Sequence, residues 1–154
     1  MFATTIAFAN LLLASLVVGA MFGIWLSQNP IELGATVYVS QQQHAIRALN
    51  VAMPVLGGVT ALLTIAAAVL ARSDRTRLIL LIAAVVCFVA AGLITRLLNQ
   101  PINAIVMTWA IDAPPADWMQ LRDEWWRWHV LRMAAGVIGL CLLIAATLKS
   151  ASSC

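Results

Sequence analysis

The 154-residue chain has few charged residues, and this scarcity excludes most classes of soluble protein. Charged side chains make up 10% of the sequence, whereas a soluble globular domain has roughly 25%. Hydrophobic residues make up 63%, which indicates an integral membrane protein. The nine basic residues outnumber the six acidic ones and are scattered along the chain. We therefore expect no nucleic-acid partner.

Histidine and cysteine are also scarce, which restricts the metal chemistry that the chain can support. The two histidines are His44 and His129. The three cysteines, Cys87, Cys141 and Cys154, lie in two apolar segments and at the C-terminus. No pair of them has the spacing of a metal site or a disulfide. We therefore predict no metal site and assign the cysteines no role beyond packing.

Long apolar segments are what the chain has in abundance. Four of them are each about 20 residues long, enough to cross a bilayer. They predict an all-α fold, a four-helix transmembrane bundle formed by a single integral membrane domain. That domain covers residues 1–154, with transmembrane helices at approximately 2–26, 44–71, 78–98 and 123–148. An ordered extramembrane segment is expected between the third and fourth helices, because residues 102–109 are mostly apolar and Asn103 can form local hydrogen bonds.

Small residues within the first two helices predict helix contacts. Gly19 and Gly23 are spaced for close contact with another helix, and Gly57 with Gly58 is expected to allow close packing as well. Pro54 is expected to kink the second helix.

The short connection Arg72–Arg77 bears on the orientation of the bundle. Alternation of four helices places both chain ends on the same side of the membrane as this connection. Together with Lys149, the connection brings four basic residues to that side. Because basic loops stay inside the cell, we predict cytoplasmic N- and C-termini in a bacterial inner or plasma membrane. Labelling of Cys154 from outside intact cells would contradict this orientation.

The same alternation gathers most of the notable polar residues at the opposite end of the bundle. They are His44, Arg47, Asn50, Arg96, Asn99, Asn103, Arg122, His129 and Arg132. Charged residues in transmembrane helices usually face the bundle interior, a partner or a pathway. Acidic residues are few near these helices, so the arginines require anionic or carbonyl partners. A quinone, a phenolate, a lipid headgroup or a haem propionate would serve.

One stripe of the fourth helix combines several of these residues. Trp118, Arg122, Trp125, His129 and Arg132 fall within about 80° of one another on a helix. One interpretation is an interfacial aromatic belt with arginine anchors. A belt needs no histidine and arginine in line with its tryptophans, and the stripe therefore favours a site shared with residues of the second helix.

Three motifs occur in order in the C-terminal half of the chain. They are Asn99-x-Pro101-x-Asn103, Pro114-Pro115-Ala-Asp-Trp118 and Arg122-x-x-Trp125-x-x-Trp128-His129-x-x-Arg132. In these motifs the chain resembles the anthrone oxygenase-like family of small membrane proteins, and the four-segment layout matches along nearly the whole chain. Members with a known role oxidise anthrones to anthraquinones with dioxygen, without a metal or flavin, whereas most bacterial members have no assigned function. The resemblance implies a cofactor-independent monooxygenase that acts on an anthrone-like phenolic or quinol-type aromatic.

The resemblance also implies roles for individual residues. Carried over by position, the motifs point to Asn99, Asn103, Trp125, His129 and Arg132. A base would be needed to deprotonate the substrate, and His129 or His44 has a suitable ordinary pKa. Arg132 or Arg47 would stabilise the resulting phenolate. The expected substrate-binding residues are Asn99, Asn103, Trp118, Arg122, Trp125, Arg47 and Asn50, with the asparagines on the carbonyl and the tryptophans as flat walls.

Two alternatives remain open. In the first, His44 and His129 are axial ligands of a haem whose propionates contact the arginines; copper is a weaker choice, because no Met or Cys lies near them. In the second, the chain is a non-enzymatic accessory subunit of a membrane complex, with a lipid or a protein partner at the polar end. The expected partners are the lipid bilayer, a small aromatic or quinone-like molecule, and a membrane-protein partner or a second copy of the chain.

Overall fold

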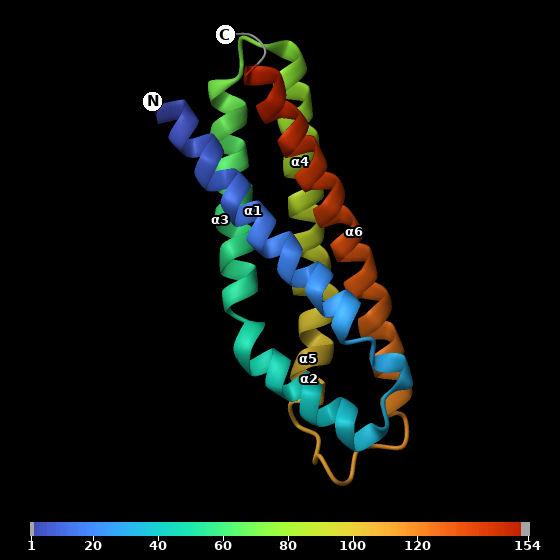
Figure 1. The fold of residues 1–154 in the computed structure, drawn as a ribbon. Helices are drawn as coiled ribbons and strands as arrows, with labels where there is room; N and C mark the ends of the chain where they lie inside the picture. The colour runs from blue at the N-terminus through green and yellow to red at the C-terminus, as the bar shows by residue number, and fades with distance from the viewer. Residues whose placement is uncertain (1, 152–154) are drawn as a thin grey trace.

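The computed structural model describes residues 2–151, and this part of the chain is helical without strands (Figure 1). Cys154 lies outside the described residues. Four helices are long and apolar enough to cross a membrane, with candidate spans Ala3–Glu32, Ala52–Leu70, Arg75–Val106 and Trp118–Lys149. The predicted all-α fold with four transmembrane helices is confirmed, and the chain is an integral membrane protein.

The elements follow one another with short connections. In chain order they are α1 (Phe2–Ser27), the single turn η1 (Pro30–Glu32), α2 (Ala35–Leu49), α3 (Ala52–Leu70), α4 (Arg75–Ile94), the π-helical turn η2 (Thr95–Asn99), α5 (Gln100–Val106) and α6 (Trp118–Ala151). α4, η2 and α5 are continuous. The start of α1 and the end of α6 lie at the same end of the bundle as the α3–α4 connection (Figure 1).

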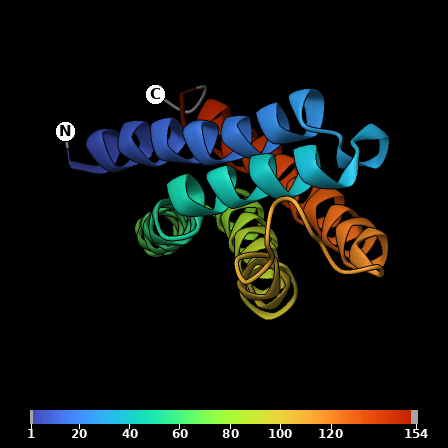
Figure 2. The same cartoon turned by 90° about the horizontal axis from the view of Figure 1, so that it is seen from below.

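The prediction of one helix over residues 44–71 was wrong. The helix breaks between Leu49 and Ala52, and α2 lies across the lower end of the bundle at an angle to α3 (Figures 1 and 2). Pro54 explains the break, because its missing N–H and its ring are tolerated in the first turn of a helix but not in the interior. A new helix therefore begins just before Pro54 instead of a long one being kinked there.

Most of α2 falls in residues 27–43, which lie between the first two predicted transmembrane helices and outside both. The pattern that identifies it as a helix is a buried face spaced by three or four residues: Tyr38, Val39, Gln42, Gln43 and Ile46. Two of these residues are glutamines, so hydrophobic periodicity alone does not reveal the face. Gln43 holds α2 in place, since its Nε2 donates to the carbonyls of Val106 at 3.0 Å and Trp109 at 2.9 Å.

The segment between α4 and α6 is ordered, as predicted. Residues 100–106 form α5, and Asn99 and Asn103 are buried, with exposed fractions of 0% and 8%. The backbone of Met107, Thr108 and Trp109 closes turns at the end of α5. Both asparagines therefore face protein and not bulk water.

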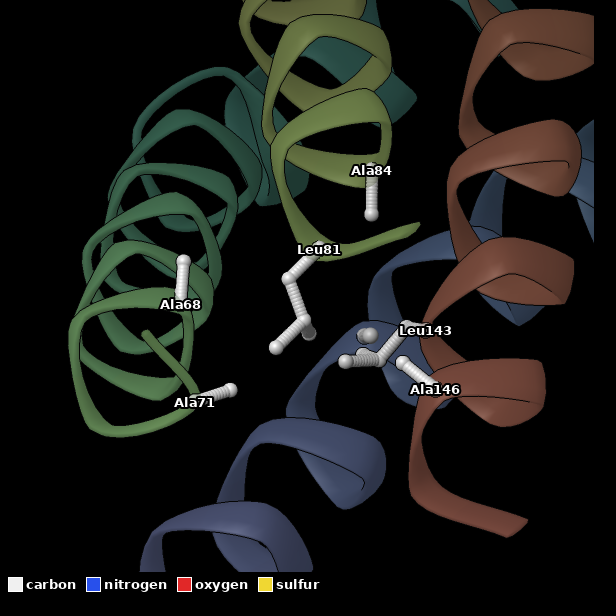
Figure 3. Close-up of a cluster of buried hydrophobic side chains, with 7 residues drawn as sticks. Ala68, Ala71, Leu81, Ala84, Leu143 and Ala146 are labelled. Atoms are coloured by element: carbon white, nitrogen blue, oxygen red, sulfur yellow. The ribbon is translucent and has the colours of Figure 1, made fainter. Parts of the chain in front are cut away.

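An alanine-rich cluster packs the bundle at the end where the termini lie. Its members are Ala14, Ala68, Ala71, Leu81, Ala84, Leu143 and Ala146, and Figure 3 shows most of them gathered between α3, α4 and α6. Small side chains let helix backbones approach closely in a membrane. At a similar depth Asn10 Nδ2 donates to Thr64 Oγ1 at 3.1 Å and ties α1 to α3.

The predicted glycine contacts were wrong. A Cβ added at Gly19, Gly23, Gly57 or Gly58 would meet no other atom within 4 Å, so these glycines do not mediate close packing. The close approaches occur instead on α6. A Cβ at Gly136 would lie 2.7 Å from Met21 Cε of α1, and one at Gly139 would lie 2.9 Å from Phe88 Cε1 of α4. Glycines on α6 therefore allow its close packing against both α1 and α4.

Candidate functional site

A cavity of about 340 Å³ lies inside the bundle near the end that α2 crosses. Its volume is within the range of roughly 300–1,000 Å³ that is typical of small-molecule sites. Apolar side chains such as Val18, Met21 and Phe88 form most of its wall. Its polar lining residues are Gln28, Gln42, Asn50, Thr60, Thr95, Arg96, Gln100, Asn103 and Arg132. A mostly apolar cavity with a few polar groups suits a lipophilic ligand that carries an oxygen.

Asn103 is the centre of a hydrogen-bond network at the polar end of the cavity. Trp125 Nε1 donates to Asn103 Oδ1 at 2.8 Å, and Gln42 Nε2 lies 3.5 Å from the same oxygen. Asn103 Nδ2 in turn donates to Asn50 Oδ1 at 2.9 Å. The orientation of this amide is determined, because an indole N–H can only donate. The network joins α2, α5 and α6, and all four side chains line the cavity.

Asn99 has a different position from Asn103. The π-helical turn η2 contains Asn99, whose Nδ2 donates to the backbone carbonyl of Trp125 at 3.0 Å. Its Oδ1 is buried and has no hydrogen-bond partner among the described residues. Asn99 is fully buried but does not line the cavity, so it fixes η2 to α6 without contacting the space where a ligand would bind.

His129 is fully buried between two indoles. Its ring stacks on Trp125 at 5.2 Å and on Trp126 at 5.5 Å between centroids. Nδ1 lies 3.3 Å from Arg132 Nε and 3.0 Å from Arg132 Nη2, so it must accept, because a guanidinium has only donors. Nε2 therefore carries the proton and donates to the carbonyl of Met21 at 3.2 Å. Both ring nitrogens are occupied within the protein.

Arg132 lines the cavity and carries a charge without a counter-ion. Besides its contacts with His129, Nη1 donates to Thr95 Oγ1 at 3.3 Å, and Cζ lies 5.8 Å from the ring centroid of Trp125. Among residues 2–151 no carboxylate lies within salt-bridge distance of this guanidinium. These contacts leave one N–H on Nη1 and one on Nη2 without a partner. An uncompensated cation next to an apolar space favours an anionic ligand.

Trp118 and Arg122 belong to a separate cluster that does not line the cavity. Arg122 Nε pairs with Asp123 Oδ1 at 2.8 Å, and its Cζ lies 4.9 Å from the centroid of Trp118. The Tyr38 ring lies tilted against Trp118, with 5.5 Å between the ring centroids. Burial raises the pKa of the Tyr38 phenol well above its ordinary value, while the charge of Arg122 acts in the opposite direction. The cluster contacts η1 through a bond from Arg122 Nη1 to the carbonyl of Ile31 at 3.3 Å.

The stripe of α6 faces the bundle interior and not the headgroups. Arg122, Trp125 and His129 have exposed fractions of 7%, 6% and 0%. The belt interpretation was therefore wrong. The stripe nevertheless divides into two parts, because only Trp125 and Arg132 line the cavity.

The contribution of the predicted second helix also differs from expectation. His44 and Arg47 are exposed on α2 and do not line the cavity, and Arg47 Nη2 donates to Gln43 Oε1 at 3.2 Å. Asn50 is the one candidate from this region that reaches the cavity. The change follows from the break before α3, which rotates α2 so that Gln42 and not His44 points inward.

Several cavity residues were missed by sequence reasoning. They are Gln28, Gln42, Thr60, Thr95 and Gln100, together with the apolar wall. Arg96 was expected at this end of the bundle but not as a site residue. Gln42 lies four residues before Ile46 on the buried face of α2, but hydrophobic periodicity does not reveal a face that includes two glutamines. Thr95 carried no signal either, because its inward position depends on the π-helical turn.

His44 and His129 are not placed to serve as the two axial ligands of a haem. An axial ligand needs a free ring nitrogen, and both nitrogens of His129 hydrogen-bond to protein groups. His44 is exposed on α2 and away from the cavity. Within residues 2–151, moreover, no group of three or more His, Cys, Asp or Glu side chains is placed to hold a metal ion.

Comparison with known proteins adds one finding. A family model described as anthrone oxygenase matches residues 43–142, about two thirds of the chain. The match begins in α2 and ends in α6, so it includes Asn50, Asn103, Trp125 and Arg132. Searches of curated proteins and of solved structures gave no match.

Proposed function

Since this chain belongs to the anthrone oxygenase family, we propose that it is a membrane-embedded oxygenase that acts on an anthrone-like phenolic or quinol-type aromatic with dioxygen. The observation that carries the proposal is the environment of Arg132. Its guanidinium lines a mostly apolar cavity, has no carboxylate partner among the described residues and keeps two N–H groups without a hydrogen-bond partner. That is the arrangement expected for binding the delocalised anion of a flat aromatic.

The chemistry requires little from the protein beyond stabilising that anion. An anthrone loses a proton from its methylene carbon to give a phenolate, and this carbanion-like anion reacts directly with dioxygen. Overall, anthrone and dioxygen give anthraquinone and water. One oxygen atom becomes the new carbonyl and the other leaves as water, so dioxygen takes up all four electrons and no further reductant is needed.

Arg132 is the residue to which we assign stabilisation of the phenolate. Its charge lies in a low-dielectric site, where electrostatic interactions are stronger than in water. By favouring the anion over the neutral substrate, the guanidinium makes the methylene proton more acidic. Asn50, Asn103 and Gln42 provide amide groups for the oxygen that dioxygen introduces at the methylene carbon, and Trp125 forms a flat wall.

His129 takes a different role from the one predicted. No imidazole and no carboxylate is among the side chains that line the cavity, so none of these side chains is suited to act as a general base. We propose that water at the polar end of the cavity accepts the methylene proton of the substrate. His129 positions the guanidinium of Arg132. By accepting from Nε and Nη2, its Nδ1 holds the guanidinium of Arg132 in one orientation at the cavity wall.

The orientation in the membrane is part of the proposal. Arg72, Arg75, Arg77 and Lys149 lie at the end of the bundle that holds the chain ends, and basic residues favour the cytoplasmic side. We place that end in the cytoplasm of a bacterial cell and the cavity toward the outer leaflet. Labelling of Cys154 from outside intact cells contradicts this arrangement.

Turnover by the purified protein tests the function. In lipid nanodiscs, anthrone should yield anthraquinone with one dioxygen consumed per product, faster than in empty nanodiscs. Arg132→Leu should lower kcat by about 10²–10³-fold, the usual effect of removing a group that stabilises an oxyanion. Arg132→Lys should be impaired as well, because a point charge does not reproduce a planar fork of donors.

Arg127 offers a matched control on the same helix. It is exposed, lies 5.9 Å from the Trp128 ring and does not line the cavity, so Arg127→Leu should retain normal turnover. Equal rates for Arg132→Leu and the unsubstituted protein, or no rate above that of empty nanodiscs, would refute the proposal.

A further inference from the structure

The cavity has a mouth, and its position follows from the exposure of the lining residues. Those contributed by α1, α2, α5 and α6 are buried or half-buried. The exposed ones all lie on α3 or on α4 and η2: Pro54, Gly58, Val89, Gly92, Leu93 and Arg96. The cavity therefore opens sideways, between α3 and α4, and not through the end of the bundle that α2 crosses.

Glycines keep this mouth open. A Cβ added at Gly57 or Gly58 of α3, or at Gly92 of α4, would meet no other atom within 4 Å. These residues therefore do not bring the two helices into contact. Glycine in a helix interior is unfavourable by roughly 1 kcal/mol relative to alanine, and here it leaves room where any larger side chain would extend into the opening.

The mouth lies within the membrane-spanning part of the bundle. Gly58 is six residues into α3, or about 9 Å along the axis at 1.5 Å per residue. Val89 and Leu93, which flank Gly92, are 43% and 53% exposed, as expected for side chains that face lipid. Arg96 follows one turn after Gly92, toward the end of the bundle, where headgroups are within reach. The opening thus faces acyl chains, with its polar edge at the headgroups.

We infer that the cavity is filled laterally from the bilayer through this portal, formed by Pro54, Gly58, Val89, Gly92 and Leu93. Its ligand is a membrane-dissolved flat aromatic with a polar end. Such a molecule keeps its rings among acyl chains and its oxygen near the headgroups. The cavity also has its polar groups toward the end of the bundle where Arg96 lies. These groups belong to Arg132, Asn103 and Gln100. The ligand therefore passes through the portal in the orientation that it already has in the membrane.

The identity of the ligand as an oxidisable aromatic rests on the proposed function, but the route does not. Photolabelling tests the route without turnover. The protein is placed in phosphatidylcholine nanodiscs with a bilayer-soluble aryl diazirine, irradiated, and analysed by mass spectrometry of its peptides. Met21 and Trp125 report on the interior, because both line the cavity and are only 7% and 6% exposed. Phe8, 69% exposed, reports on the lipid-facing surface.

Large side chains at the portal should protect the interior. In Gly58→Trp and Gly92→Trp, label at Met21 and Trp125 should fall by about tenfold or more, since an indole covers roughly 200 Å². Label at Phe8 should not change. Gly19→Trp is the matched control: Gly19 is an exposed helical glycine with nothing within 4 Å of an added Cβ, but it does not line the cavity.

A block introduced after folding removes any effect on folding itself. Gly92→Cys, with Cys87, Cys141 and Cys154 replaced by alanine, can be treated with a bulky bilayer-soluble maleimide in the folded protein. Loss of label at Met21 and Trp125 after maleimide treatment supports the portal. The proposal is overturned if both residues remain labelled in the treated Gly92→Cys protein and in both tryptophan variants. If interior label is lost but the unsubstituted protein does not oxidise anthrone, the portal stands and the proposed oxygenase function fails.

Discussion

At the scale of single residues, Arg132 and His129 form a unit in which each side chain explains the other. A guanidinium has five N–H donors, and three of them are directed to Nδ1 of His129 and Oγ1 of Thr95. The imidazole is held in one tautomer by the Met21 carbonyl and the Arg132 donors, and two stacked indoles hold its ring plane. A buried acceptor of fixed orientation restricts the orientations that the guanidinium can take at the cavity wall.

His129→Asn separates positioning from base catalysis. The Oδ1 atom of asparagine can accept from Arg132 as Nδ1 does, but the amide does not titrate. We expect His129→Ala to lower kcat by about 10²-fold, as loss of an oriented donor would, and His129→Asn to recover much of that loss. The pH dependence of kcat should keep its shape in His129→Asn. A titration near neutral pH that is present in the unsubstituted protein and lost in His129→Asn would show that His129 is the base.

At the scale of elements, α2 is the part that sequence reasoning described least well. Apolar length identifies four spans, because the bilayer sets the length that each must have. It does not identify an amphipathic helix that buries Gln42 and Gln43, since their burial depends on partners in α5 that are distant in the chain. The break before α3 could be predicted from the sequence, because Pro54 signals either a kink or a helix start. The direction of α2 relative to α3 could not be predicted, and this direction determines that Gln42, and not His44, reaches the cavity.

Gln43 tests how α2 is held. Its side chain is 4% exposed and provides the N–H groups for two carbonyls, those of Val106 and Trp109. Gln43→Leu should lower the free energy of unfolding by about 1–3 kcal/mol, the cost of buried groups left without partners. Hydrogen exchange should accelerate in α2 and not in α3. Gln41→Leu, at a half-buried neighbour, is the control, and equal exchange in the two variants would contradict this role for Gln43.

At the scale of the whole molecule, packing is unequal between the two ends of the bundle. The end that holds the termini is closed by the alanine-rich cluster (Figure 3). Closer to the middle, Gly136 and Gly139 let α6 approach α1 and α4. Toward the other end the bundle encloses the cavity beside a second hydrophobic cluster. Composition indicated that a membrane bundle would form, and the alternation of its four spans indicated at which end its polar residues would gather. The cavity itself was not predictable, because a void depends on the helix directions set by the break before α3 and by the π-helical turn.

This inequality predicts opposite effects for the same substitution at the two ends. Ala61 lines the cavity, whereas Ala84 is 0% exposed within the alanine-rich cluster. Ala61→Phe should fill empty space and raise the Tm by a few degrees, because each kcal/mol corresponds to roughly 2–4 °C in a chain of this size. Ala84→Phe should lower the Tm, since overpacking costs about 1–3 kcal/mol. Thermal unfolding in one detergent measures both. The more stable Ala61→Phe protein should also lose binding of the aromatic ligand, because the phenylalanine ring would occupy the volume in which the ligand binds. A lower Tm for Ala61→Phe than for Ala84→Phe would mean that the space beside Ala61 is not the open cavity described above.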